Sequence, residues 1–299
     1  LGQTTPTEIS LKREEIKVKA VPYFSMLNSE VGYVKLTSFT DNCSGEVKEA
    51  VLKLKEKNCK SLILDLRGNP GGLLHEAVNI VNLFIDKNNE VVSTRGKVKE
   101  WNKQYFSLYS PIDTQIPLVV LVDNNSASAS EIVSGALQDL DRAVILGQRS
   151  YGKGLVQQTR PLTYNTQLKV TVAKYYIPSG RCIQALDYTH KDEDGRVEKV
   201  PDSLITAFKT KNGRIIYDGA GILPDVKTED VKYSNILATL LNKNHIFTFV
   251  NQYLINHPQY QTTAATVSLS DNDYNDFINY LKTKDYKYKT QSDFALEDL

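Results

Sequence analysis

The chain has 299 residues, of which 41% are hydrophobic and 24% charged, with a formal net charge of +1. The composition is that of an ordinary soluble globular protein, and the small net charge gives no electrostatic case for a nucleic-acid or anionic-membrane partner. No apolar run approaches the roughly 20 residues that a membrane-spanning helix needs. The length exceeds what one compact core usually holds, so we expect one large domain with an appendage.

Predicted strands and helices alternate in the first part of the chain. Apolar alternation or continuous apolar runs predict strands at 7–21, 31–39 and 60–66. Apolar residues at helical spacing predict helices at 44–58 and 73–85. The segment "RGNPGG" breaks the chain directly after the third strand.

The same alternation continues in the middle of the chain. Short apolar runs predict buried strands at 116–123 and 143–148, with a helix at 129–140 between them. Residues 155–178 predict a hairpin, and the polar stretch 187–202 predicts a surface loop. A repeated order of strand, turn, helix and strand indicates an α/β domain with a largely parallel core.

The character of the sequence changes after Val226. Residues 234–255 have a helical pattern, and Ser270 with Asp273 marks the start of a further helix. The apolar face of that helix follows at helical spacing, at Tyr274, Phe277, Ile278 and Leu281. We interpret 227–299 as a helical appendage.

Cysteine and histidine residues form no pattern of a metal or cofactor site. The three cysteines and four histidines are scattered, without an HExxH motif or a Cys/His cluster. An odd number of widely spaced cysteines also argues against a disulfide framework. We therefore expect no metal and no cofactor.

The stretch "DNNSASASE" places three alternating serines between a predicted strand and a predicted helix. Ser128 stands three residues before Glu131, which matches an N-capping box, so one interpretation is that Ser128 only caps the helix. The other is a nucleophile at a strand-to-helix turn, where the first amides and the positive helix end favour a developing oxyanion.

A nucleophilic serine needs a base. His75 is not excluded, but Lys153 is the better candidate, because a helix and a strand return the chain to the serine turn and glycines flank the lysine. At the reference lysine pKa of ~10.4, about one amine in 2,500 is neutral at pH 7. A lysine base should therefore be poorly solvated and lack a carboxylate partner; the alternative for this residue is a solvated loop lysine.

Glycines follow a buried strand in "DLRGNPGG", at 65–72. One free amide there, together with the Ala129 amide, would make a two-donor oxyanion hole, in which each donor is typically worth a factor of ~10²–10³ in rate. The alternative is a simple turn that ends the strand. A phosphate-binding loop is excluded, because the sequence has no GxxxxGK[ST] motif.

Six segments carry a resemblance to a known family: "GYVKLTSF", "LILDLRGNPGG", "PLVVLVDNNSASASEIVSGALQD", "RAVILGQRSYGKGLVQ", "KVTVAKYYIPSGRCIQ" and "GILPDV". In this order, over about residues 30–226, they resemble the carboxy-terminal processing peptidases, or tail-specific proteases. The resemblance implies an α/β fold with a crotonase/Clp-protease-like ββα core. It also implies a serine endopeptidase with a Ser–Lys dyad that acts in or near the C-terminal tails of proteins.

Residue by residue, the resemblance implies Ser128 as nucleophile, Lys153 as general base and Gln157 as the side chain that orients the lysine. The implied oxyanion donors are Gly72 and Ala129, with Gly71 as the nearby alternative to Gly72. Asp139 also matches a family position, and we interpret it as structural.

The family usually carries a whole PDZ domain before its core. Here only 1–21 could be the end of such a domain and its linker, followed by the core at 22–226 and the helical appendage at 227–299. The appendage is expected to pack on the core or to build a homodimer. Because the first residue is Leu, we expect a processed or partial chain, from which a signal peptide or a membrane anchor could have been removed.

The resemblance further implies protein or peptide substrates with extended apolar C-termini. It implies a place in the bacterial cell envelope, periplasmic or extracytoplasmic and membrane-associated. Two alternatives remain: a non-catalytic peptide-binding relative, and a crotonase-type acyl-CoA enzyme that shares the fold and the oxyanion hole. A cluster of basic residues around a nucleotide pocket would support the second alternative, and the sequence shows none.

Overall fold

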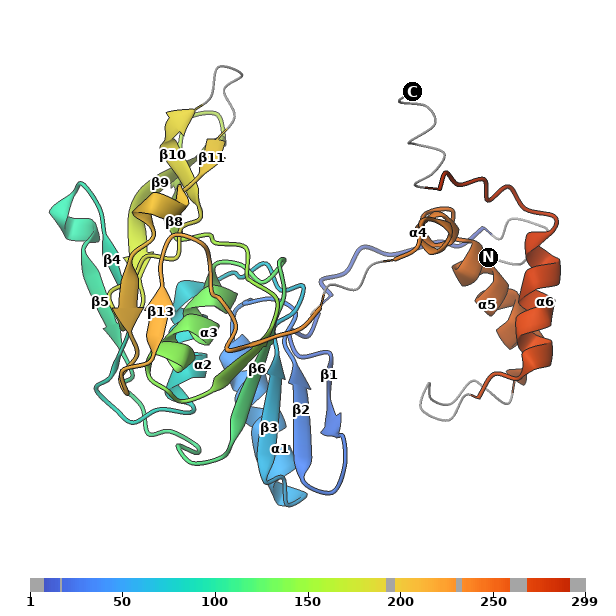
Figure 1. Ribbon diagram of the computed structural model, residues 1–299, viewed down its shortest axis with the longest axis horizontal. Coiled ribbons are helices and arrows are strands. Elements are labelled where there is room, and N and C mark those ends of the chain that lie inside the picture. Colours follow the sequence, from blue (N-terminus) through green and yellow to red (C-terminus); the bar gives the residue numbers. More distant parts are fainter. Residues whose placement is uncertain (1–7, 17, 192–196, 230–232, 259–267, 291–299) are drawn as a thin grey trace. The chain divides into compact units, whose positions relative to one another are not determined.

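The computed structural model describes residues 8–16, 18–191, 197–229, 233–258 and 268–290. The chain divides into two compact units, Ile16–Glu229 and Leu1–Glu15 with Asp230–Leu299. The first unit is mixed α/β, and the described part of the second is helical (Figure 1).

The larger sheet of the α/β unit has six strands, in the order β1 (Tyr23–Met26), β2 (Val31–Lys35), β3 (Ser61–Asp65), β6 (Leu118–Val122), β7 (Val144–Gly147) and β14 (Val226–Lys227). The five strands β2, β3, β6, β7 and β14 run parallel to one another, and β1 pairs antiparallel with β2. Parallel strands are covered on both faces, which explains the nearly continuous apolar runs in β3 and β6. Leu62, Leu64, Val120 and Val122 are all buried.

A second, antiparallel sheet has the strand order β5 (Lys103–Phe106), β4 (Glu90–Arg95), β9 (Gln167–Tyr176) and β8 (Leu155–Pro161). Among the described residues of this unit, the α-helices are α1 (Cys43–Glu56), α2 (Leu74–Asn82) and α3 (Ala129–Asp139). Helix α3 contacts β7 of the first sheet and β4 of the second. It therefore lies between the two sheets, with all 11 of its residues buried (Figure 1).

The register of the parallel sheet brings three chain segments together at the carboxyl ends of the strands. Asp65 pairs with Leu121, and Val122 pairs with Gly147, so β3, β6 and β7 end side by side. The glycine segment after β3, the serine turn after β6 and the lysine segment after β7 all leave from this edge. In open α/β sheets, ligands commonly bind beyond the carboxyl ends of the strands.

The structure confirms the strands and helices predicted for the parallel core, with ends shifted by a few residues. The strand predicted at 7–21 was wrong for the described residues 8–16 and 18–21, where no strand forms. The exposed Ile9, Leu11 and Ile16 give the alternating pattern, but a strand also needs a partner for its backbone groups. The loop predicted at 187–202 was also wrong in part.

In that predicted loop, β10 (Leu186–Lys191) and β11 (Val197–Lys199) pair as an antiparallel hairpin. Backbone pairing holds a two-stranded ribbon of this kind, and polar composition does not reveal it. Two further short strands, β12 (Ala207–Lys209) and β13 (Ile215–Tyr217), form another hairpin. The described residues of the unit also form short 3₁₀ helices at Lys99–Trp101 and Asp202–Leu204.

The helical unit contains α4 (Asn235–Asn242), α5 (His245–Asn256) and α6 (Asp271–Leu281). Asn244 has a φ of 57°, a left-handed conformation that interrupts a helix. The helical stretch predicted at 234–255 therefore forms two helices instead of one. The ring of Phe249 contacts those of Tyr253, Phe277 and Tyr280, so aromatic packing joins α5 to α6. Among the helices that the structure describes, none is long and apolar enough to cross a membrane.

Candidate active site

The three alternating serines have different surroundings. The Ser126 hydroxyl donates to the Leu66 carbonyl at 2.8 Å, and the Ser130 hydroxyl donates to the Asn69 carbonyl at 2.9 Å. The Ser128 side chain stands in a capping-box arrangement with Glu131 but makes no cap hydrogen bond. The outer serines therefore fasten the turn to the glycine segment, and the middle hydroxyl is available for other contacts.

The backbone of Ser128 has φ 56° and ψ −113°, a region that residues other than glycine rarely adopt. Such conformations cost roughly 1–3 kcal/mol and persist only where the surroundings hold them. Here the Ser128 N–H donates to the Glu131 carboxylate at 2.8 Å. The Ser128 carbonyl accepts from the N–H groups of Glu131 and Ile132, at 2.9 and 3.0 Å. Both sides of the serine peptide are thus fixed at the start of α3.

Glu131 is fully buried and connects the serine turn to the lysine segment. Besides Ser128, its carboxylate accepts from the Ser150 hydroxyl at 2.6 Å and from the N–H groups of Gly152 and Lys153 at 2.7 and 2.8 Å. Burial raises the pKa of Glu131, and these hydrogen bonds act in the opposite direction. The sequence predicted only the capping contact, because the other three donors come from a distant loop.

The amides of Gly72 and Ala129 have no acceptor among the hydrogen bonds of the described residues, and both residues line one pocket. The Gly71 N–H, in contrast, donates to the Asn69 side chain at 2.9 Å. Gly72 is therefore better suited than Gly71 as the second oxyanion donor. Gly71 itself has φ 99°, and a Cβ there would lie 2.8 Å from the Cβ of Ser128, so only glycine fits against the turn.

All five predicted site residues line the same pocket, which has a volume of about 460 Å³. Its other walls are largely apolar and include Leu73, Leu74, Ile132, Leu155 and Val156. A neighbouring pocket of about 860 Å³ shares Pro70, Lys153, Leu155 and Gln157 with it. His75 lines neither pocket, so the alternative of a histidine base has no support from its position.

Lys153 is half-buried at this pocket. Within the described part of the chain, its amine has no ion pair and no hydrogen bond, including none to the Ser128 hydroxyl. Its backbone is well held, because the N–H donates to Glu131 and the carbonyl accepts from the Tyr175 hydroxyl. The main chains of Ser128 and Lys153 are therefore fixed, while the lysine side chain is not.

A buried carboxylate fixes the beginning of the glycine segment. Asp65 accepts hydrogen bonds from the Tyr33 hydroxyl at 2.6 Å and from the Arg67 N–H at 2.8 Å, and it pairs with the side chains of Arg67 and Lys35. Burial alone would raise the pKa of Asp65, but the hydrogen bonds from Arg67 and Tyr33 outweigh it and lower the value to about 2. The charged form of Asp65 thus positions the chain that leads to Gly72.

Asp139 lies at the other end of α3. It is buried and pairs with the buried guanidinium of Arg181 at 2.9 Å, and its second oxygen accepts from the Ser179 N–H at 2.9 Å. It does not line the pocket of Ser128. These contacts agree with the structural role expected for it.

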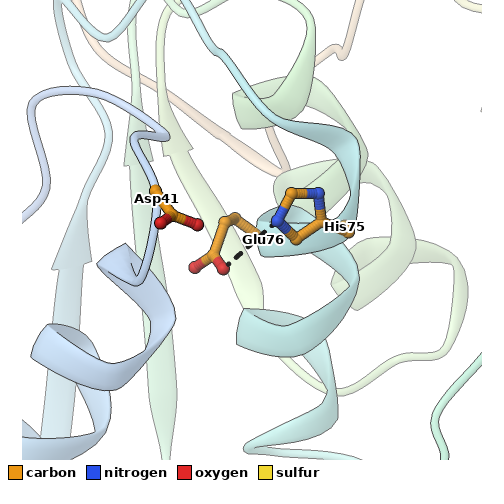
Figure 2. Close-up of side chains that lie close together, drawn as sticks. All are labelled: Asp41, His75 and Glu76. Carbon is orange, nitrogen blue, oxygen red and sulfur yellow. Dashed lines mark ion pairs between the residues drawn. The ribbon is translucent and has the colours of Figure 1, made fainter.

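Asp41, His75 and Glu76 are the described residues that come closest to a metal-binding group, with one potential ligand atom each within 4.8 Å of the others. Figure 2 shows them at the start of α2 and in the turn before α1. Glu76 is already used structurally, because it accepts from the Ser44 N–H at 2.7 Å and pairs with His75 at 3.5 Å. The donors suit a divalent cation, but the contacts are equally those of an ion-paired helix start.

Comparison with known proteins gives two family matches. The model of "Peptidase family S41" matches residues 30–192, and that of "Probable PDZ-protease, C-terminal helical domain" matches residues 236–299. A carboxy-terminal-processing protease of Bartonella bacilliformis is 41% identical over 192 residues, which cover 63% of this chain and 44% of the relative. A probable CtpA-like serine protease of Staphylococcus aureus is 42% identical over 223 residues, 74% of this chain and 40% of the relative.

Among solved structures, the photosystem II D1 C-terminal processing protease aligns with a TM-score of 0.53 and 27% identity, over 73% of this chain and 50% of that one. The chain spans less than half the length of the two curated relatives. The family match covers more than half of the chain and includes the serine turn, the glycine segment and the lysine. The chain therefore belongs to peptidase family S41.

Proposed function

We propose that this chain is the catalytic part of a serine endopeptidase that hydrolyses peptide bonds in or near the C-terminal tails of proteins. The observation that carries the proposal is the arrangement around Ser128. Its hydroxyl, Lys153 and two amides without acceptors among the described residues line one pocket at the carboxyl edge of the parallel sheet. Membership of family S41 and the similarity to processing proteases support the same reaction.

In the proposed reaction, the Ser128 Oγ attacks the carbonyl carbon of the scissile bond, and its proton passes to the Lys153 Nζ. The negative charge on the carbonyl oxygen is stabilised by the N–H groups of Gly72 and Ala129 and by the N-terminal end of α3. Collapse expels the amine, which takes the proton from Lys153 and leaves an acyl-enzyme. Water then attacks the ester, with Lys153 again accepting a proton, and releases the acid and Ser128.

Gln157 is proposed to orient the lysine amine. It lies in β8, four residues after Lys153, and lines the same two pockets. Since neither the Gln157 side chain nor the lysine amine has a hydrogen bond among the described residues, both are available for this contact. The lysine side chain must reach the serine hydroxyl when substrate binds, because catalytic hydrogen bonds are often incomplete in free enzymes.

The substrates we propose are protein tails with apolar C-termini, since apolar side chains form most of the pocket wall beside Ser128. The adjoining larger pocket, which Lys153 also lines, gives an extended peptide further room. We further propose an extracytoplasmic location in the bacterial cell envelope, a crotonase-like core at 22–226, a residual end of a PDZ domain at 1–21 and a helical appendage at 227–299 that forms a homodimer. The match of a C-terminal helical domain to residues 236–299 supports the appendage.

The test is cleavage of an unfolded reporter protein with an apolar C-terminal tail by this chain, Ser128→Ala and Lys153→Ala. We expect cleavage by the parent and a loss of at least ~10³-fold in kcat/KM in both variants. Lys169→Ala tests the other lysine that lines the pocket. If Lys169→Ala abolishes cleavage and Lys153→Ala does not, the base is wrongly assigned. If the parent binds the tail without cleaving it, the chain is a peptide-binding relative.

A further inference from the structure

Tyr175 is a buried tyrosine that the proposed reaction does not use. It lies in β9, is 2% exposed and lines the pocket of Ser128. Its N–H donates to the Gly154 carbonyl at 3.0 Å, which holds β9 beside the lysine segment. A buried tyrosine hydroxyl usually finds a hydrogen-bond partner, so the partners of this one indicate what its polar end does.

The Tyr175 hydroxyl reaches the carbonyl oxygens of both proposed dyad residues. It lies 3.2 Å from the Ser128 carbonyl and also hydrogen-bonds the Lys153 carbonyl. The Ser128 carbonyl has two further donors, the N–H groups of Glu131 and Ile132. The Lys153 carbonyl has no other donor among the described residues. The lysine peptide therefore depends on this hydroxyl more than the serine peptide does.

Glu131 completes the arrangement by binding the N–H groups of the same two residues. Its carboxylate accepts from the N–H groups of Ser128 and Lys153, each at 2.8 Å. One buried acceptor thus takes both amides, and one buried hydroxyl donates its proton to the Lys153 carbonyl while it lies 3.2 Å from the Ser128 carbonyl. Burial, with the charge of Glu131 as a further cause, raises the pKa of Tyr175 well above its usual value, so its hydroxyl stays protonated and remains a donor.

We propose that Tyr175 is a positioning residue of the peptidase, whose hydroxyl fixes the Lys153 peptide against the Ser128 turn so that the lysine amine can reach the serine hydroxyl. This inference rests on the proposed function. Since no hydrogen bond joins the two side chains in this structure, the backbone contacts through Tyr175 and Glu131 set their relative position. A displacement of a catalytic group by about 1 Å can lower a rate about 10²-fold.

The first test compares Tyr175→Phe with Tyr176→Phe, its matched control. Tyr176 is the next residue of β9, half-buried under the guanidinium of Arg95 at 4.3 Å from the ring centre, and outside the pocket of Ser128. We expect Tyr175→Phe to lower kcat about 10- to 100-fold with KM within twofold of the parent, because substrate contacts are kept. Tyr176→Phe should keep both constants. A lower melting temperature with unchanged kcat would mean that the hydroxyl only stabilises the fold through its buried hydrogen bonds.

The second test measures the placement of Lys153 without catalysis. In the Ser128→Ala background, labelling of Lys153 by an amine-reactive reagent is followed against pH by peptide mass spectrometry. We expect Tyr175→Phe, and not Tyr176→Phe, to change the rate and the pH midpoint of labelling. Identical profiles in both variants, with kcat within twofold, would overturn the inference.

These two measurements also separate this inference from the proposed function. If the parent chain cleaves nothing and Ser128 reacts with no fluorophosphonate, the proposed function fails. The labelling profile of Lys153 then still decides whether Tyr175 controls the position of the lysine.

Discussion

Two helices of this protein begin with the same sequence signal, a serine followed three residues later by an acidic residue. At the start of α6, Ser270 has φ −90° and ψ 168°, and its side chain accepts from the Asp273 N–H at 3.3 Å. At the start of α3, Ser128 has φ 56° and ψ −113° and makes no cap hydrogen bond with its side chain. In both helices the acidic side chain accepts from the N–H of the serine.

The acidic residues show what the difference means. Asp273 is half-buried and takes two further hydrogen bonds, from the Tyr253 hydroxyl at 2.6 Å and from the Ser270 hydroxyl at 2.7 Å. Glu131 is fully buried and takes three more donors, all from the lysine segment. In α6 the serine side chain caps the helix and the acid also contacts α5, whereas in α3 the acid holds the lysine segment through three donors and the serine side chain makes no cap hydrogen bond. Backbone conformation and burial, not the motif, separate the two cases.

The largest expected effect tests whether the start of α3 acts together with the glycine segment that follows β3. In Gly72→Ala, the new Cβ would lie 2.3 Å from the Phe39 carbonyl oxygen and displace the Gly72 amide. We expect a loss of about 10²- to 10³-fold in kcat with the fold retained. Gly68→Ala is the control, because Gly68 also has a positive φ but no atom within 4 Å of a Cβ. Equal kcat in both variants would contradict this role for Gly72.

The second effect concerns the acids. Glu131→Gln places an amide group among four hydrogen-bond donors, which leaves buried donors unpaired. We expect a loss of about 3 kcal/mol in the free energy of unfolding, measured in urea, and at least a tenfold lower kcat/KM. Asp273→Asn should loosen only the start of α6 and leave kcat/KM at the parent value. Parent-like activity and stability in Glu131→Gln would show that the two acids are equivalent caps.

A smaller effect separates the two serines by stability alone. Ser270→Ala removes a side-chain cap, which is worth about 1 kcal/mol, so the first amides of α6 should exchange with solvent about fivefold faster. Ser128→Ala removes a hydroxyl without a cap hydrogen bond, so the first amides of α3 should exchange within twofold of the parent rate. Hydrogen exchange measured at single residues decides the matter. Faster exchange at α3 would mean that Ser128 is a cap after all.

The smallest effect is a difference in pH response. Hydrogen bonds from Tyr253 and Ser270 lower the pKa of Asp273 to about 2, below the ~3.9 of an unfolded chain. Its contribution is therefore present above about pH 4 and is lost as the pH falls toward 2. Burial raises the pKa of Glu131, so this carboxylate takes up a proton at a higher pH than Asp273 does. In NMR titrations, the Ser270 amide should respond near pH 2 and the Ser128 amide above ~4.3; a shared midpoint would contradict this.

Much of the parallel core could be predicted from the sequence, because β3, β6 and α3 each carry a strong local apolar pattern. The serine turn and Lys153 could be located because glycines, small residues and sheet order bring them to one edge. Tyr175 and the loop partners of Glu131 could not, since they depend on the register of β9 and on the path of 150–153. The hairpin of β10 and β11 could not be predicted for a related reason, because backbone pairing has little effect on amino-acid composition.

The order of these segments along the chain has a consequence for biosynthesis. Ser128 is synthesised before Lys153, and the hydroxyl that reaches both of their carbonyls is carried by β9, which ends at Tyr176. A nascent chain that has emerged only as far as β7 has the serine turn but neither the lysine nor its buried donor. We expect such a chain to be inert toward peptide bonds. Unfolded chains nearby, including the nascent chain itself, would then be safe from cleavage until β8 and β9 have folded onto the serine turn.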